Sequence, residues 1–357
     1  MVVPTTQDRV QVHVPSARKT LVQTGPKSQG LDYTPARGLR VQPKKYSGSL
    51  DQFESFKPTP NIGLEFKDLQ LANLSDRQIE DLSILVSQYG VVFLRAQSIT
   101  AEQQLEFGRK IATPKGTLHV HPLTFKTTGS ALDEISVISN ELPSKEYSDD
   151  GPASDGWHAD ITFEKTPSNY AALQINDGPE TGGDTLFSSG YAAYDRLSAP
   201  LKKFLEGLTA IHNADFFKNV ASERGSEIRT DRGADNTGFD LTAVHPVVRT
   251  NPVTGWKSLF VNKGFTKKIV ELRKDESDAV LAYLFNHIAG GHDFNVRFKW
   301  GTGDIAIWDN RSVFHTATKD FDPSILRRGN RVVPLGEKPY FDPSSSSRSE
   351  SIRVSKL

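Results

Sequence analysis

Short apolar runs of the kind that form β-strands recur along this 357-residue chain, and helical segments lie between them. The runs at 62–66, 91–94, 259–261 and 304–308 either alternate in polarity or are continuously apolar, as half-buried and fully buried strands are. The sequence contains no internal repeat. Strands spread over the whole length, with helices among them, predict one mixed α+β domain. We expect an antiparallel barrel or jelly-roll core, a double-stranded β-helix with flanking and inserted helices.

Two of the expected helices begin with a capping box, in which a Ser or Thr and a Gln three residues later satisfy each other's backbone N–H groups. Ser75 with Gln78 forms the first box, and Thr100 with Gln103 forms the second. Gly90 is expected to end the first helix, because glycine readily adopts the left-handed conformation of a helix end. Further helical patterns cover residues 191–208 and 277–289.

Composition divides the chain into three regions. Residues 1–58 are polar and lack a sustained period, which predicts a polar N-terminal arm. Residues 59–343 carry the periodic segments and form the expected domain. Residues 344–357 are rich in serine and are predicted to be a flexible tail. Within the domain, residues 140–156 are expected to form a long mobile loop, because they combine Pro, Gly, Ser and acidic residues with little to bury.

Charge balance and missing residue types exclude several classes of function. Lys plus Arg and Asp plus Glu both number 43, so no global field draws the chain to nucleic acid or to an anionic membrane. No run approaches the roughly 18 apolar residues of a membrane span. The absence of cysteine excludes disulfides, thiolate metal sites and cysteine nucleophiles. Any preference for an anionic small molecule must therefore come from a few placed residues.

His158 and Asp160, two positions apart, are candidate metal ligands. Residues i and i+2 of a strand share a face, so both side chains could reach one ion. Two histidines and one carboxylate make the facial triad of non-haem Fe(II) oxygenases, which leaves coordination positions open. Of the nine histidines, His315 is the candidate third ligand, because it closely follows the apolar run and polar turn of Gly303–Arg311. A zinc site or a satisfied polar cluster is the alternative interpretation of these three residues.

Three arginines follow the candidate third ligand. If residues 327–331 form a strand, Arg327 and Arg331 face the same way and Arg328 faces the opposite way. Two guanidinium groups directed at one pocket could each bind a carboxylate or a similar anion. We therefore expect one of them to bind a co-substrate and the other to bind the substrate.

Seven blocks of sequence extend this pattern beyond the triad. They are LHVHP (118–122), WHADITFEKTP (157–167), TGGDTLFSSGYAAYDRLS (181–198), HPVVRTNPVTG (245–255), LFVNKGFT (259–266), GDIAIWDNR (303–311) and RVVPLGEKPY (331–340). Their order and spacing resemble the taurine dioxygenase family of Fe(II)- and 2-oxoglutarate-dependent dioxygenases, which also contains alkylsulfatase and phenoxyacetate dioxygenases. The resemblance spans about residues 60–342 and is closest to the sulfonate-cleaving branch, as in fungal-type alkylsulfonate dioxygenases.

The resemblance implies a role for each matched residue. Fe(II) would be bound by His158, Asp160 and His315, with 2-oxoglutarate as co-substrate and O2 as oxidant. Thr185 would hydrogen-bond the C1-carboxylate side of 2-oxoglutarate, and Arg327 would bind its distal carboxylate. His121 and Arg331 would bind the anionic head of the substrate. The walls of the substrate pocket would be formed by Phe187, Phe260 and Trp308.

The resemblance also implies the reaction. We expect hydroxylation of an anionic organic substrate, preferably a sulfonate or sulfate ester, with release of succinate and CO2. One alternative is hydroxylation or desaturation of an anionic carboxylic acid or secondary metabolite without C–S cleavage. A zinc hydrolase using the same ligands and a catalytically inactive binding module are two further alternatives. Binding of 2-oxoglutarate would argue against the hydrolase, and succinate formation would argue against the inactive module.

Two positions depart from the taurine enzymes. Thr124 replaces a tyrosine that follows the His-Pro pair, and Ser154 replaces an asparagine four residues before the first ligand. Both replacements predict an altered pocket that accepts a larger organic group than that of taurine.

The sequence closes with Ser355-Lys356-Leu357, a tripeptide that the peroxisomal import receptor reads as an address. We expect a peroxisomal protein, which would otherwise be cytoplasmic, and the sequence leaves open whether it forms a homo-oligomer. Removing residues 355–357 should leave a fluorescent fusion of the chain in the cytosol without changing the activity of the purified protein. An unchanged cellular distribution after this deletion would contradict the interpretation.

Overall fold

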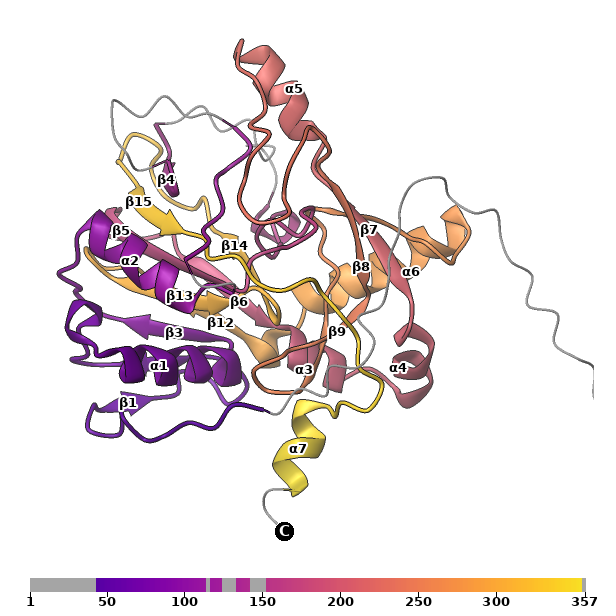
Figure 1. The fold of residues 1–357 in the computed structure, drawn as a ribbon, viewed down its shortest axis with the longest axis horizontal. Coiled ribbons are helices and arrows are strands. Elements are labelled where there is room, and N and C mark those ends of the chain that lie inside the picture. Colours follow the sequence, from indigo (N-terminus) through magenta and orange to yellow (C-terminus); the bar gives the residue numbers. More distant parts are fainter. Residues whose placement is uncertain (1–42, 114–115, 124–132, 142–151, 355–357) are drawn as a thin grey trace, which may run out of the picture. The chain divides into compact units, whose positions relative to one another are not determined.

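The computed structural model describes residues 43–113, 116–123, 133–141 and 152–354, and these form a mixed α/β fold (Figure 1). Thr124, most of the expected loop at 140–156 and the terminal tripeptide lie outside the described residues. Among the described residues, no helix is both long and apolar enough to cross a membrane.

The largest sheet has seven strands in the order β1-β2-β3-β13-β5-β15-β4. Neighbouring strands are antiparallel, except for the parallel pair β2 and β3. The predicted strands at 62–66, 91–94 and 304–308 are confirmed as β2, β3 and β13. The bounds are β1 Ser55–Phe56, β2 Leu64–Phe66, β3 Val91–Leu94, β4 Ile135–Ser139, β5 Tyr170–Asp177, β13 Ile305–Asp309 and β15 Arg328–Val332.

A second sheet of three antiparallel strands has the order β12-β6-β14, with bounds β6 Thr185–Ser189, β12 Asn295–Phe298 and β14 Val313–Ala317. Side chains from both sheets meet in one buried cluster. Phe93 of β3 stacks on Phe298 of β12 with 4.1 Å between ring centroids, and it meets the edge of Phe187 of β6 at 5.7 Å. The aromatic rings of this cluster therefore hold the two sheets face to face.

Helices α1 (Asp76–Tyr89) and α2 (Ala101–Ile111) cover the other face of the seven-stranded sheet (Figure 1). Val92 and Leu94 of β3 pack against them, whereas Val91 and Phe93 point into the cluster between the sheets. A strand buried on both faces has no polar positions, which explains why β3 is apolar throughout. Both predicted capping boxes are present, and Gly90 ends α1 with φ 82°.

Most of the remaining elements pack in two further buried clusters, whereas η1 packs in the cluster with α1. The helices are η1 Leu71–Asn73, η2 Ala153–Asp155, α3 Gly190–Asp195, α4 Ala199–Leu205, α5 Phe216–Glu223, α6 Lys274–Ala289 and η3 His292–Phe294. The strands are β7 Thr209–Asn213, β8 Thr242–Pro246, β9 Val248–Thr250, β10 Lys257–Leu259 and β11 Thr266–Ile269. Strands β11, β7 and β8 form a sheet in that order, and β9 pairs with β10.

Two expectations for this region are wrong in detail. The single helix expected over 191–208 is two helices, α3 and α4, because Pro200 in the first turn of α4 has no N–H with which to continue a preceding helix. The strand expected over 259–261 ends at Leu259, and Phe260 and Val261 are buried outside it. The helix expected over 277–289 is confirmed as part of α6.

The described parts of both polar ends are structured. Leu50, within the expected N-terminal arm, is 1 % exposed and belongs to the cluster under α1. Helix α7 (Arg348–Val354) lies in the expected flexible tail, and its Ser349 hydroxyl donates to Asp195 of α3 over 2.7 Å. The prediction of a flexible tail is therefore wrong for residues 344–354. Serine side chains hydrogen-bond this segment to the domain, a role that composition does not reveal.

Phe187 offers a test of the packing between the sheets, because it is 0 % exposed. We expect Phe187→Ala to lower the free energy of unfolding by about 3–5 kcal/mol, through lost burial and the cavity left behind. Urea unfolding of the full chain measures this loss. The matched control is Phe204→Ala in α4, which is 44 % exposed and should change stability by no more than about 0.5 kcal/mol. Equal effects of the two substitutions would contradict the described packing.

Candidate metal centre and the cavity around it

Backbone pairing places the two candidate histidine ligands side by side. His158 N–H donates to the carbonyl of His315 over 3.0 Å, and His315 N–H donates to the carbonyl of His158 over 2.8 Å. His315 is in β14, whereas the expected strand around His158 is reduced to this one bridge. Asp160 already lies in a turn, and Ile161 follows with φ 50°, a left-handed conformation that is strained for a β-branched residue. This sharp turn, rather than strand alternation, directs Asp160 toward the histidines.

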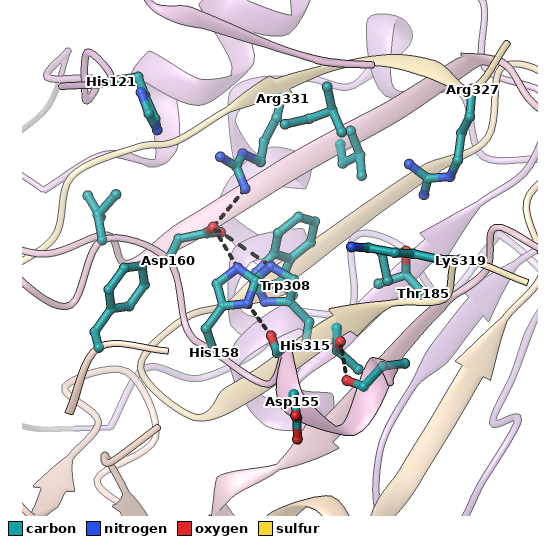
Figure 2. A pocket seen from close by; sticks show the side chains of 18 of the residues that line it. His121, Asp155, His158, Asp160, Thr185, Trp308, His315, Lys319, Arg327 and Arg331 are labelled. Carbon is teal, nitrogen blue, oxygen red and sulfur yellow. Dashed lines mark hydrogen bonds and ion pairs between the residues drawn. The ribbon is translucent and has the colours of Figure 1, made fainter. Parts of the chain in front are cut away.

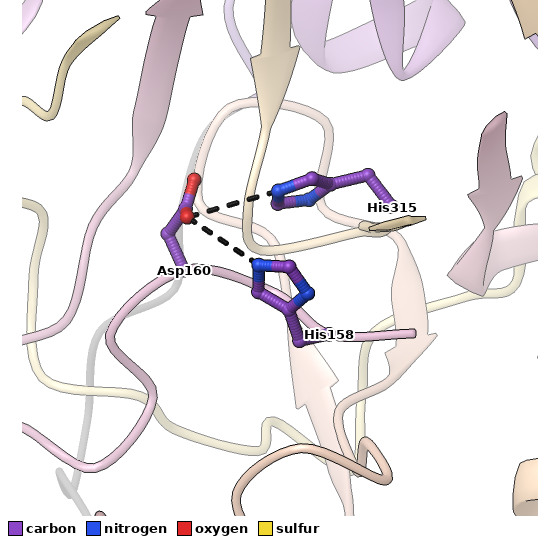
Figure 3. Close-up of side chains that lie close together, drawn as sticks. All are labelled: His158, Asp160 and His315. Atoms are coloured by element: carbon purple, nitrogen blue, oxygen red, sulfur yellow. Dashed lines mark ion pairs between the residues drawn. The ribbon is translucent and has the colours of Figure 1, made fainter. Parts of the chain in front are cut away.

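The three side chains converge on one point (Figure 3). Asp160 Oδ1 lies 3.8 Å from His158 Nε2 and 3.7 Å from His315 Nε2. One potential ligand atom from each residue lies within 4.8 Å of the others. His158 Nδ1 donates to the carbonyl of Gly156 over 2.7 Å, so its Nε2 lone pair is available for a metal. The expected convergence of His158, Asp160 and His315 is thus present.

Both imidazoles have the protonation state that metal binding requires. Burial, followed by the positive charge of Arg331, lowers the pKa of His158. Burial and the neighbouring His158 and Arg331 lower the pKa of His315 well below its ordinary value. Neutral imidazole is the form that binds a metal ion, so the site needs no deprotonation of its histidines near neutral pH.

Asp160 remains ionised although it is only 3 % exposed. Burial alone would raise its pKa, but Arg331, the two histidines and a hydrogen bond from Asn310 lower that pKa to about 2. Arg331 Nη1 donates to Oδ1 over 2.8 Å. Asn310 Nδ2 donates to Oδ2 over 3.2 Å, and Asn310 Oδ1 accepts the backbone N–H of Asp160 over 3.0 Å. Asn310 therefore orients the carboxylate at both its side chain and its backbone.

The triad forms part of the wall of a cavity of about 300 Å3 (Figure 2). Arg327, Thr185 and Lys319 lie on one side of the triad, and His121 lies on the other. We call the first side the arginine end and the second side the aromatic end. The aromatic end contains the described lining residues His121, Ile161, Phe163, Phe217 and Phe265.

At the arginine end, Arg327 and Thr185 both offer hydrogen-bond donors to the cavity. Arg327 is 7 % exposed, and its Nε donates to the carbonyl of Gly183 over 2.9 Å. Burial lowers the pKa of Arg327 to about 10, so the guanidinium stays charged. Thr185 Oγ1 accepts the indole N–H of Trp300 over 3.0 Å, which leaves the hydroxyl proton of Thr185 to donate elsewhere. Both donors belong to residues that line the cavity.

Arg331 lies next to Asp160 of the triad, and His121 lies farther from Arg327 than Arg331 does (Figure 2). Arg331 and Arg327 line the same cavity, whereas Arg328 points outward and pairs with Asp177. The predicted alternation of the three arginines is therefore confirmed. His121 Nδ1 accepts the backbone N–H of Leu123 over 3.1 Å, so the proton of the neutral ring is on Nε2, a donor.

Two predicted wall residues do not line the cavity. Phe187 lies behind Trp308 and His315, with ring centroids 5.6 and 6.2 Å away, so it packs beneath the wall. Phe260 packs on His212 and His245 instead. The prediction that these two phenylalanines form pocket walls is wrong, whereas Trp308 does line the cavity.

Several functional candidates were not identified from the sequence. They are the orienting residue Asn310, the cation Lys319 and the aromatic residues Phe163, Phe217 and Phe265. The sequence feature that could have indicated Asn310 is its position in a polar turn directly after a buried strand. Phe163, Phe217 and Phe265 come from three distant segments, so no spacing connects them. Ser154 is exposed and does not line this cavity, so its difference from the taurine enzymes does not act on the described wall.

Comparison with known proteins agrees with this geometry. The sequence profile described as "Taurine catabolism dioxygenase TauD, TfdA family" matches residues 54–333. An α-ketoglutarate-dependent dioxygenase of Aspergillus oryzae, oryG, is 37% identical over 87% of this chain and 96% of its own length. An α-ketoglutarate-dependent sulfonate dioxygenase of Saccharomyces cerevisiae is 36% identical over 82% of this chain and 69% of its own length. A taurine dioxygenase structure from Burkholderia xenovorans superposes with a TM-score of 0.65 at 29% identity, covering 82% and 92% of the two chains.

The chain belongs to the TauD/TfdA family of dioxygenases. It is an oxidoreductase, and its relatives use α-ketoglutarate, which is 2-oxoglutarate. The expected resemblance to this family is confirmed.

Asn310 provides a test of how the metal centre is oriented. We expect Asn310→Ala to weaken metal affinity roughly 10- to 100-fold, the usual cost of losing a group that orients a metal ligand. A competitive Mn(II) titration of the folded protein measures the affinity, with circular dichroism to verify the fold. The control is Asn61→Ala, whose side chain donates to a surface carbonyl of Asp293 and should not alter metal binding. Unchanged affinity in the folded Asn310 variant would contradict the orienting role.

Proposed function

We propose that this protein uses Fe(II) and 2-oxoglutarate to hydroxylate an anionic organic substrate, preferably a sulfonate or sulfate ester. The observation that carries the proposal is one cavity lined by a His-Asp-His triad and by two arginines, Arg327 and Arg331. We further propose that the two facing sheets are the double-stranded β-helix of this enzyme class. The seven- and three-stranded sheets with a shared core support that assignment.

The chemistry of the donor set fits Fe(II). Two neutral imidazoles and one ionised carboxylate are the ligands of the facial triad, which leaves open positions for other ligands. His158, Asp160 and His315 would hold the ion. When bound, iron supplies the activation of O2 that couples decarboxylation of 2-oxoglutarate to hydroxylation of the substrate. The protein contributes ligand orientation through Gly156 and Asn310.

The arginine end suits the co-substrate. 2-Oxoglutarate carries two carboxylates, and a buried guanidinium binds a carboxylate through parallel charge-assisted hydrogen bonds. Arg327 is held by the Gly183 carbonyl and stays charged, so it would bind the distal carboxylate. Thr185 would add its hydroxyl donor on the C1-carboxylate side. Both residues are buried, and charges interact more strongly away from water, so burial would strengthen these contacts.

Arg331 and His121 suit the anionic head of the prime substrate. Arg331 Nη1 binds Asp160, but its Nε is buried and meets no acceptor among the described residues. A buried donor without an acceptor indicates a ligand position, because native proteins rarely leave such groups unpaired. His121 Nε2 offers a neutral donor. A guanidinium and a neutral donor match an oxyanion such as a sulfonate or sulfate.

The balance of the reaction fixes the products. One atom of O2 enters succinate and the other enters the substrate as a hydroxyl group, while CO2 leaves the co-substrate. If the hydroxylated carbon bears a sulfonate, its C–S bond breaks to give an aldehyde and sulfite. A sulfate ester similarly gives an aldehyde and sulfate. The sulfonate dioxygenase of Saccharomyces cerevisiae among the relatives supports this substrate class.

A second candidate is hydroxylation of an anionic carboxylic acid or secondary metabolite without C–S cleavage. Guanidinium groups bind carboxylates and sulfonates alike. Relatives such as oryG bear names that specify α-ketoglutarate dependence without a sulfonate. Sulfite or sulfate release separates the two candidates, whereas succinate is formed in both.

The aromatic end supports a substrate with a larger organic group than that of taurine. Ile161, Phe163, Phe217 and Phe265 line the cavity and belong to one apolar cluster, in which Phe217 packs against His121. Such a wall favours burial of alkyl or aryl groups over a short polar chain. Expected substrates are therefore long-chain or aromatic sulfonates and sulfate esters.

The two arginines provide the test. Arg331→Ala should weaken binding of an anionic prime substrate and spare 2-oxoglutarate, whereas Arg327→Ala should do the reverse. Truncating a buried charged contact costs about 2–5 kcal/mol, which corresponds to at least a tenfold rise in KM. Succinate formation across taurine, longer and aromatic sulfonates, sulfate esters and carboxylates measures both effects.

The matched control is Arg328→Ala, in the same strand but facing outward to Asp177, which should leave both KM values unchanged. If neutral compounds are turned over as well as anions, or if Arg331→Ala leaves the preference for anions intact, the substrate assignment is wrong.

A further inference from the structure

Trp308 has a polar contact that its place in the cavity wall does not explain. Its ring lines the cavity, with 4.8 Å between its centroid and that of His315. Its indole N–H donates to Asn310 Oδ1 over 3.0 Å. We propose that Trp308 is a positioning residue, which orients the Asn310 amide and thereby the metal ligand Asp160. The inference rests on the proposed metal centre and adds a residue that acts on it without binding the ion.

The donors around Asn310 determine which way its amide faces. An indole N–H and a backbone N–H can only donate, so both must meet the oxygen of the amide. Trp308 Nε1 and the backbone nitrogen of Asp160 each lie 3.0 Å from Asn310 Oδ1. The amide nitrogen therefore faces Asp160 Oδ2, to which it donates over 3.2 Å. In the reversed orientation an amide oxygen would face the carboxylate, and no hydrogen bond could form between two acceptors.

Ser168 holds the nitrogen side of the same amide. Its hydroxyl proton is donated to the carbonyl of Tyr170 over 2.6 Å, so its oxygen accepts the second N–H of Asn310 over 3.0 Å. The backbone N–H of Asn310 donates to the carbonyl of Asn169 over 2.9 Å. The side-chain amide thus accepts two hydrogen bonds at its oxygen and donates two from its nitrogen, which is its full capacity. Trp308 supplies one of these four bonds.

Burial makes each bond of this network important. Asn310, Trp308 and Ser168 are each 1 % exposed, so bulk water does not replace a donor that is lost. In a buried network the hydrogen bonds support one another, and a member left unsatisfied is costly. Without the indole N–H, Asn310 Oδ1 would keep only the hydrogen bond from the backbone of Asp160. The amide would then hold the carboxylate of Asp160 less firmly, and groups that orient a metal ligand affect metal affinity.

The test is a double-mutant cycle on metal affinity, which requires no turnover. Trp308→Phe removes the indole N–H and keeps an aromatic ring in the wall. We expect it to weaken Mn(II) binding to the full chain roughly two- to tenfold, the net effect of one hydrogen bond. In the Asn310→Ala background the same substitution should change affinity by less than about twofold, because Trp308 then has no amide to orient. A competitive Mn(II) titration measures the affinities, and circular dichroism verifies each fold.

Trp300→Phe is the matched control, because Trp300 is also buried and its indole N–H donates to a side chain, Thr185 Oγ1, away from the three ligands. It should bind Mn(II) like the parent. Unchanged affinity in folded Trp308→Phe, or an equal loss in the parent and Asn310→Ala backgrounds, would overturn the inference alone. A parent chain that binds neither Mn(II) nor Fe(II) would overturn the proposed metal centre as well.

Hydrogen exchange of the indole protons gives a second measurement, which does not depend on whether Trp308→Phe folds. Asn310→Ala removes the acceptor of the Trp308 indole N–H and should speed its exchange roughly two- to tenfold. The indole N–H of Trp300 should exchange as in the parent. NMR of 15N-labelled protein resolves the two protons. Equal exchange of the Trp308 proton in parent and Asn310→Ala would overturn the inference.

Discussion

The ionised carboxylate of Asp160, buried at the centre of the cavity wall, is the constraint on which the site depends. An unpaired carboxylate is costly to bury, so its partners must be held in place around it. Those partners come from separate parts of the chain: Arg331 from β15, His315 from β14 and Asn310 from the turn between β13 and β14. The two facing sheets bring these segments together. The fold thus provides the opposing charge that the buried carboxylate requires, and the same arrangement prepares three metal ligands.

Because Asp160 needs a positive partner, Arg331 and Arg327 have different roles. Arg331 neutralises the charge of Asp160 through its Nη1. Its Nε is buried and has no hydrogen-bond acceptor among the described residues. Arg327 is anchored by a backbone carbonyl and contacts no carboxylate among the described residues through an ion pair. In the proposed function, Arg331 would therefore contact both Asp160 and a ligand, whereas Arg327 would bind a ligand alone. In a chain without net charge, such a local arrangement would attract anions to the cavity.

The sequence predicted the alternation of the arginines because it follows from local spacing. It predicted the convergence of His158, Asp160 and His315 from the segments around these residues. Residues two or four apart on a strand share a face, which placed Arg327 and Arg331 together and Arg328 outside. The spacing does not indicate how far a side chain lies from the cavity surface. Phe187 was therefore predicted to line the cavity, although it lies beneath Trp308. The aromatic end depends on contacts among distant segments such as Phe217 in α5 and Phe265 before β11, and these arise only in the folded chain. The sharp turn at Asp160 was also missed, because strand alternation explained the His-x-Asp spacing equally well.

Equilibrium binding of Fe(II) under anaerobic conditions tests the central claim most directly. We predict that the parent chain binds one Fe(II) and that Asp160→Ala loses this binding. Asp155→Ala, which removes an exposed carboxylate from the same cavity wall, should keep it. Retention of tight Fe(II) binding by a folded Asp160→Ala variant, or equal loss in both variants, would contradict the assignment of His158, Asp160 and His315 as the metal centre.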